Sequence, residues 1–247
     1  MSEGDQSPTT DGEQSTQVDA NRDPIGHETQ SILTAGAPAR GAEIALVLLH
    51  GRGATAQGVI NLFEPLYRHG LTVLAPEAYR GRWFPRSPTA PLEANEPWLT
   101  ASVERVETCL ERVQQIGVPP ERTVVVGFSQ GACVAATWAV RHPRRYGAIG
   151  VLSGVVPGAV EGRADAEHEK TRSREAVGSL ENTPVYVGCG DADPNLSLEH
   201  VEATADTLGE AGGAVDLEII PGVGHAVSEE AFAWLESVID RLKETET

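Results

Sequence analysis

The chain has 247 residues, enough for one large or two small domains with a sizeable hydrophobic core. Its formal net charge is -17 at pH 7, so its surface repels nucleic acids and anionic membranes. Three cysteines are too few for a disulfide framework, no apolar run is long enough to cross a bilayer, and the N-terminus is unlike a secretory signal, so we expect a soluble cytoplasmic protein.

Residues 1–37 mix Ser, Thr, Gln, Gly and Asp with few apolar side chains. Such a composition buries too little apolar surface to offset the entropy lost on ordering. We therefore predict a disordered acidic tail, followed by a domain over residues 38–247. The acidity of the whole chain serves solubility in the simplest interpretation, and adaptation to high salt is the alternative.

Beyond the tail, short apolar runs alternate with amphipathic stretches. Strands are predicted at residues 43–49, 71–75, 123–126, 148–152, 185–189 and 215–220. Helices are predicted at residues 56–67, 99–116, 129–141, 198–211 and 228–242. Buried β-branched runs that alternate with helices indicate an α/β fold, a doubly wound and mostly parallel sheet with helices on both faces. A charged stretch at residues 158–174 interrupts this rhythm and is predicted to be a surface excursion.

In such sheets the functional residues gather where strands end. Ser129 lies in Gly127-Phe-Ser-Gln-Gly131, a G-x-S-x-G pattern between a predicted strand and a predicted helix. The two glycines leave room for a strained turn that projects the hydroxyl and aims a helix N-terminus at it. We interpret Ser129 as a nucleophile, although a tight turn with a capping serine has the same residues.

A serine nucleophile needs a base and an acid, in the chain order Ser, acid, His. His225 lies in the Gly-rich loop after the last predicted strand, whereas the other histidines, apart from His50, fall in the predicted tail, in the excursion, on a helix or at helix ends. The acid is expected in the loop after residues 185–189, which offers Asp191 and Asp193. Their spacing leaves the choice between them open.

Backbone N–H groups are needed to stabilise an oxyanion. Gln130, directly after the serine, supplies one, and Arg52 in the loop His50-Gly-Arg-Gly-Ala54 is the best candidate for the other. His50 is expected to brace this loop. The aromatic side chains of Trp83, Phe84 and Trp98 are candidates for the wall of the substrate site, and core positions are equally consistent with them.

Taken together, LLHGRGATA, LAPEAYRGRWFP, GFSQGACVA, GCGDADPNLS and PGVGHAVSEE resemble the phospholipase/carboxylesterase family of α/β-hydrolases, across about residues 43–242. The acid loop of that family places its Asp four residues before a Pro, a position that Asp193 takes here, with Ser197 in place of the Pro. Relatives that are thioesterases have HGLGD where this chain has HGRGA. The resemblance implies a serine hydrolase without metal or cofactor, in a family where homodimers are common.

The predicted activity is hydrolysis of a small-molecule carboxylic ester through an acyl-enzyme, with Ser129, His225 and Asp193 as the catalytic residues. Thioesters or lysophospholipids are alternative substrates for the same residues. A different class of function, a non-catalytic binding protein on the same scaffold, is the further alternative.

Overall fold

The computed structural model describes residues 26–160 and 178–244. Its described strands form one seven-stranded sheet in the order β1-β3-β2-β4-β5-β6-β7. Neighbouring strands pair in parallel, except that β1 is antiparallel to β3. The strands are β1 Ile32–Gly36, β2 Ile44–Leu49, β3 Leu71–Pro76, β4 Thr123–Phe128, β5 Ala148–Leu152, β6 Pro184–Gly190 and β7 Ala214–Ile220. The predicted doubly wound, mostly parallel sheet is confirmed.

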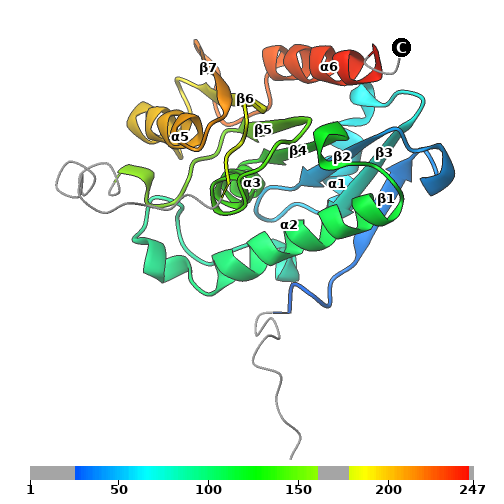
Figure 1. Cartoon of the computed structure of the whole chain (residues 1–247). Coiled ribbons are helices and arrows are strands. Elements are labelled where there is room, and N and C mark those ends of the chain that lie inside the picture. Colours follow the sequence, from blue (N-terminus) through cyan, green and yellow to red (C-terminus); the bar gives the residue numbers. More distant parts are fainter. Residues whose placement is uncertain (1–25, 161–177, 245–247) are drawn as a thin grey trace, which may run out of the picture.

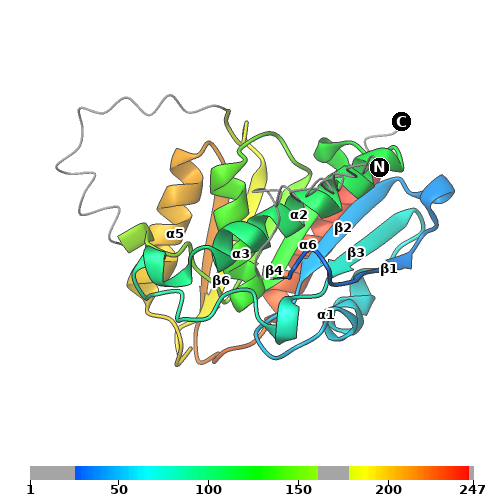
Figure 2. The ribbon, with the colours of Figure 1, turned by 90° about the horizontal axis from the view of Figure 1, so that it is seen from below.

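Helices cover both faces of this sheet (Figures 1 and 2). They are α1 Ala56–Leu62, α2 Trp98–Gln115, α3 Gln130–Arg141, α5 Leu198–Glu210 and α6 Glu229–Glu244. Buried side chains of α2, α3 and α5 belong to one hydrophobic cluster, and those of α1 and α6 to a second cluster. Strand β2 contributes alternate residues to the two clusters, because successive side chains of a strand point to opposite faces. This explains why its sequence is apolar throughout.

The N-terminal boundary of the domain differs from the prediction. Residues 1–25 lie outside the described residues, but the second part of the predicted tail is folded, because Ile32–Gly36 pair with β3 from Pro76 to Thr72. Just before this strand, His27 is buried and lies 3.0 Å from the carbonyl oxygen of Trp83. The short strand is stabilised by hydrogen bonds to the edge of a distant strand, a contribution that local composition does not reveal. The predicted tail is therefore too long.

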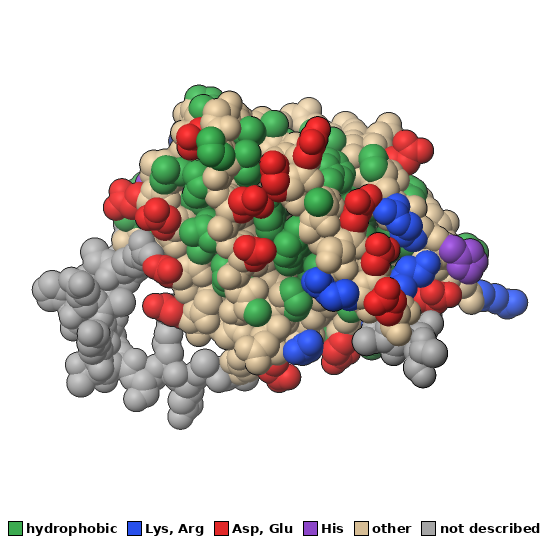
Figure 3. All heavy atoms as spheres, turned by 90° about the horizontal axis from the view of Figure 1, so that it is seen from above, with side chains coloured by type: hydrophobic (Ala, Val, Ile, Leu, Met, Phe, Trp, Pro, Cys, Tyr) green, Lys and Arg blue, Asp and Glu red, His purple; other side chains and the backbone are tan. Residues whose placement is uncertain are grey.

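The predicted excursion at residues 158–174 falls almost wholly outside the described residues, at 161–177. On the face opposite to that of Figure 2, Asp and Glu side chains are spread widely (Figure 3), in line with the net charge of -17. In the described part of the chain, no helix combines the length and apolar character that a membrane span requires.

Candidate active site

Ser129 lies between β4 and α3 in a backbone conformation that favours glycine. Its φ is 56° and its ψ is -120°. Non-glycine residues in such regions cost about 1–3 kcal/mol, and they are held there by the surrounding structure. Here the backbone N–H of Ser129 donates to the carbonyl oxygen of Leu152 at the end of β5, at 2.9 Å. The turn thus projects the hydroxyl from the carboxyl edge of the sheet.

The two glycines of the G-x-S-x-G pattern are required by close backbone contacts. A Cβ atom on Gly127 would lie 2.2 Å from the carbonyl oxygen of Gly131. A Cβ atom on Gly131 would lie 2.2 Å from the carbonyl oxygen of Leu49. Both distances are far below contact distance, so any side chain would force β4, α3 and β2 apart. The glycines therefore let the tight turn form against the end of β2.

His225 reaches Ser129 from the loop after β7. Its Nε2 lies 2.7 Å from the Oγ of Ser129, and its ring packs on Phe128 with centroids 5.2 Å apart. Ser153 helps to hold the loop, because its hydroxyl donates to the carbonyl oxygen of Ala226 at 3.2 Å. The imidazole is thus fixed in position but keeps 25% of its surface exposed.

Asp193 completes a continuous chain of hydrogen bonds. Its Oδ2 lies 2.6 Å from Nδ1 of His225, and its side chain is fully buried. The other oxygen, Oδ1, accepts from the backbone N–H of Asn195 at 2.8 Å. Because the carboxylate accepts the Nδ1 proton, Nε2 of His225 is left to accept the proton of the serine hydroxyl. Asp191, the other candidate, points elsewhere and binds the N–H of Gly222.

Arg52 and Gln130 line the same cavity as Ser129. Within the described ranges, the N–H groups of Arg52 and Gln130 have no hydrogen-bond partner. Around Arg52 the loop is held tightly, because the N–H of Gly53 donates to Gly81 O at 2.7 Å and that of Ala54 to Gly51 O at 3.1 Å. Two fixed donors without intramolecular partners beside a serine form the arrangement that an oxyanion needs.

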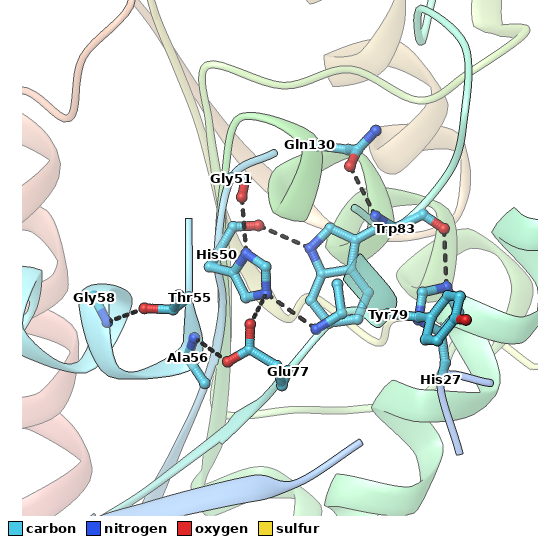
Figure 4. Close-up of polar contacts among 11 residues, drawn as sticks. His27, His50, Gly51, Thr55, Ala56, Gly58, Glu77, Tyr79, Trp83 and Gln130 are labelled. Atoms are coloured by element: carbon cyan, nitrogen blue, oxygen red, sulfur yellow. Dashed lines mark hydrogen bonds and ion pairs between the residues drawn. The ribbon is translucent and has the colours of Figure 1, made fainter. Parts of the chain in front are cut away.

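A buried polar network holds this loop against the segment after β3 (Figure 4). His50 Nδ1 donates to Gly51 O at 2.8 Å, and His50 Nε2 accepts from the N–H of Ala78 at 3.1 Å. Burial lowers the pKa of His50, although the Gly51 carbonyl and the nearby Glu77 carboxylate act in the opposite direction. His50 therefore braces the loop as a neutral imidazole, as predicted.

Trp83 connects His50 to Gln130, the residue after Ser129. Its indole Nε1–H donates to His50 O at 2.8 Å, and its backbone N–H donates to the side-chain oxygen of Gln130 at 2.8 Å (Figure 4). The side-chain nitrogen of Gln130 donates to Phe84 O, also at 2.8 Å. The side chain of Gln130 thus ties the start of α3 to the loop that walls the site.

The three aromatic candidates do not line the cavity beside Ser129. Trp83 and Phe84 are fully buried in the core, and partly buried Trp98 packs against the same cluster. Trp83 and Phe84 share this cluster with buried side chains of α2 and α3, where large aromatic rings bury much apolar surface. The expectation that they form the substrate wall is corrected. Their contribution to the site comes from the backbone, because the N–H of Trp83 and the carbonyl oxygen of Phe84 both bind the side chain of Gln130.

The cavity that opens at Ser129 has a volume of about 300 Å³. Its lining residues are Arg52, Pro85, Arg86, Ser87, Pro88, Ser129, Gln130, Cys133, Ser153, Asn195, Leu196 and His225. Cys133 is not a competing nucleophile, because burial raises the pKa of its thiol to about 12. Among the described residues, no group of three or more His, Cys, Asp or Glu side chains is placed to hold a metal ion.

Several of these lining residues were missed by the sequence analysis. Ser153 carried a usable signal, because it directly follows the predicted strand at residues 148–152 and therefore lies at the functional edge of the sheet. Leu196 carried a weaker form of this signal, because it lies in the same loop after β6 as Asp191 and Asp193. Arg86 carried none, because it lies in the long connection between β3 and α2, whose path depends on tertiary packing.

Comparisons with known proteins match the chain over most of its length. A family profile described as Phospholipase/Carboxylesterase matches residues 31–243, which include β1. A solved structure of a phospholipase/carboxylesterase from Dyadobacter fermentans superimposes with a TM-score of 0.75 at 30% identity, covering 85% of this chain and 96% of that one.

Two curated relatives differ in their named activity. A probable carboxylesterase of Oryza sativa subsp. japonica is 27% identical over 232 residues, or 83% of this chain and 79% of that protein. Acyl-protein thioesterase 1 of Debaryomyces hansenii is 23% identical over 233 residues, or 83% of this chain and 93% of that protein.

Proposed function

This chain belongs to the phospholipase/carboxylesterase family of α/β-hydrolases, and we propose that it hydrolyses small-molecule carboxylic esters through an acyl-enzyme. The observation that carries the proposal is the unbroken chain of hydrogen bonds from Asp193 to His225, at 2.6 Å, and on to Ser129, at 2.7 Å. A buried carboxylate that orients an imidazole, and an imidazole that binds a serine hydroxyl at the edge of the sheet, form a nucleophile with its base.

In the proposed reaction, the Oγ of Ser129 attacks the ester carbonyl carbon while Nε2 of His225 takes the hydroxyl proton. Asp193 accepts the hydrogen bond from Nδ1 and stabilises the imidazolium that forms. The N–H groups of Arg52 and Gln130 donate to the oxyanion of the tetrahedral intermediate. Collapse of this intermediate breaks the bond to the alcohol, which leaves with the proton from His225.

Water then completes the cycle by the same steps. His225 removes a proton from a water molecule, whose oxygen attacks the acyl carbon, and the second tetrahedral intermediate releases the acid. The proton returns from His225 to Ser129. No additional reactant is required.

Labelling with a fluorophosphonate tests this proposal most directly. The probe is expected to modify Ser129 in the wild-type protein, as mapped by peptide mass, and the Ser129→Ala variant is expected to lose both labelling and ester hydrolysis by several orders of magnitude. A non-catalytic binding protein on this scaffold predicts no labelling. Near-normal hydrolysis by Ser129→Ala would rule the assignment out.

Acyl-thioester or lysophospholipid hydrolysis by the same residues is the second candidate, favoured by the thioesterase among the relatives. The cavity volume of about 300 Å³ lies at the lower end of the range for ligand sites and favours short or medium acyl groups. Comparing 4-nitrophenyl butyrate with a palmitoyl thioester separates the two. Higher kcat/KM for the palmitoyl substrate would favour the thioesterase.

A cytoplasmic location is part of the proposal. Cys109, Cys133 and Cys189 are buried and unpaired, which suits a reducing compartment. Cell fractionation with an antibody to the protein tests the location.

A further inference from the structure

Two arginines line the cavity around Ser129. Arg52 and Arg86 are part of its wall, and none of the described residues that line it is Asp or Glu. Both charged side chains in its wall are therefore cationic, in a chain whose net charge is -17. Because the protein as a whole repels anions, two cations gathered at the reactive serine call for a specific explanation.

Arg52 is held against the wall but keeps unused donors. Its Nη2 donates to the carbonyl oxygens of Phe84 and Pro85, each at 2.7 Å. A guanidinium has five N–H donors in a fixed plane. Within residues 26–160 and 178–244, its Nε and Nη1 groups have no partner and no carboxylate pairs with it.

Arg86 is exposed, and its backbone is clamped. The N–H of Arg86 donates to Oδ1 of Asn95 at 2.9 Å, and Nδ2 of Asn95 donates to the carbonyl oxygen of the next residue, Ser87, at 2.9 Å. Asn95 is itself fully buried, so this clamp is rigid. In the part of the chain that the structure describes, the guanidinium of Arg86 forms no ion pair or hydrogen bond.

We propose that this cavity selects esters that carry a carboxylate, with the guanidinium of Arg86 binding that carboxylate and Arg52 adding to the positive potential. The inference rests on the proposed ester hydrolysis and names its substrate class. A guanidinium matches a carboxylate through two parallel hydrogen bonds, and this pairing is about twice as strong as a neutral hydrogen bond. Pro85, Pro88 and Leu196 give the wall an apolar part that suits a short methylene chain.

The carboxylate belongs to the acyl half or to the alcohol half of the ester, and two substrate pairs distinguish these. In the first pair, mono-4-nitrophenyl adipate carries the charge on its acyl chain, and 4-nitrophenyl hexanoate is its neutral match. In the second pair, 4-acetoxybenzoate carries the charge on the leaving group, and methyl 4-acetoxybenzoate is its neutral match. For each pair the measured quantity is the ratio of kcat/KM, charged over neutral.

The wild-type enzyme is expected to favour the charged member of at least one pair about ten-fold, and Arg86→Gln to reduce that ratio about ten-fold, the usual effect of losing one hydrogen bond to a charged group. Arg40→Gln is the matched control, because Arg40 is exposed on the short helical turn Ala39–Gly41 and does not line the cavity. Its ratio is expected to equal that of the wild type.

Two results overturn the inference and are distinguishable. Labelling of Ser129 together with hydrolysis of the neutral esters, but with no preference for either charged ester and no effect of Arg86→Gln on the ratios, overturns the substrate class alone. No labelling and no hydrolysis of any of the four esters overturns the proposed function as well.

Discussion

Asp191 accepts a hydrogen bond from the backbone N–H of Gly222 at 2.7 Å, and so braces the loop that carries His225 without touching the imidazole. Asp193, two residues further along, makes the contact with His225 at 2.6 Å. Two carboxylates in one loop, separated by a single residue, thus have different partners. The pair gives a direct test of which one serves the reaction.

Asp193→Asn is expected to lower kcat about 10⁴-fold, because an amide in that place favours the wrong tautomer of the imidazole. Asp191→Asn keeps an acceptor oxygen for the N–H of Gly222 and is expected to lower kcat/KM less than about ten-fold, the scale of one weakened hydrogen bond. Steady-state kinetics with 4-nitrophenyl butyrate measures both. Equal losses in the two variants would contradict the assignment of Asp193.

The backbone strain at Ser129 predicts that replacing this residue with glycine removes activity but relieves the strain on the folded state. Ser129→Gly and Ser129→Ala both remove the hydroxyl and are expected to abolish hydrolysis. Glycine accepts a φ of 56°, so Ser129→Gly is expected to be more stable than Ser129→Ala by about 1–2 kcal/mol, after the greater chain entropy of glycine is subtracted. Urea denaturation measures the difference. A glycine variant that is no more stable than the alanine variant would show that the turn is unstrained.

The contact between Gly131 and Leu49 predicts a stability loss from one methyl group. Gly131→Ala would place a Cβ atom 2.2 Å from a carbonyl oxygen, and we expect a loss of about 1–3 kcal/mol. For a chain of this size that corresponds to a decrease in Tm of about 3–10 °C. Gly41→Ala is the control, because no atom lies within 4 Å of its added Cβ. A similar Tm for both variants would refute the steric argument.

Buried His50 predicts a decrease in stability in weak acid. Burial lowers the pKa of His50 in the folded protein below the ordinary value of 6.5. Below that pH the unfolded chain therefore binds more protons at this residue than the folded chain does. The contribution of neutral His50 to the free energy of unfolding is fully present above pH 6.5 and is lost as the pH falls toward the folded pKa. The free energy of unfolding is therefore expected to decrease between about pH 7 and pH 5.

His50→Gln is expected to be less stable at pH 7, because the buried contacts to Gly51 and Ala78 change, and to show a shallower decrease toward pH 5. His69→Gln changes an exposed side chain and is expected to keep the wild-type pH dependence. Denaturant titrations at several pH values measure both slopes. An unchanged slope in His50→Gln would place the acid sensitivity elsewhere.

Much of the fold was predictable because each part of it has a local pattern. Residues 44–49 are all apolar because β2 contributes side chains to two hydrophobic clusters, one on each face of the sheet, and such a run can be recognised from consecutive residues. The same holds for Ser129, whose flanking glycines mark a tight turn, and for His225 in its Gly-rich loop after a strand. Their roles in catalysis stay predictions that the labelling and kinetic experiments test.

Other features depended on contacts between distant residues. The strand at Ile32–Gly36 is short and partly polar, and it forms because it pairs antiparallel with β3. Trp83 and Phe84 lie near the site along the chain, yet their rings turn into the core. Propensity and periodicity describe a residue and its neighbours, whereas these placements are decided by what packs against them from elsewhere in the chain.

From β2 onward, the sequence by itself determined the order of strands and helices along the chain, and with it the sheet edge at which Ser129, His225 and the acid loop had to meet. Residue spacing alone left Asp191 and Asp193 equal, and resemblance to the family favoured Asp193. Only the tertiary structure placed one carboxylate on the imidazole and the other on Gly222, and set Arg52 and Arg86 around the same cavity. The reason is physical. The order of strands and helices along the chain follows from local hydrophobic patterns, whereas the direction of a single side chain follows from the packing of segments far apart in sequence.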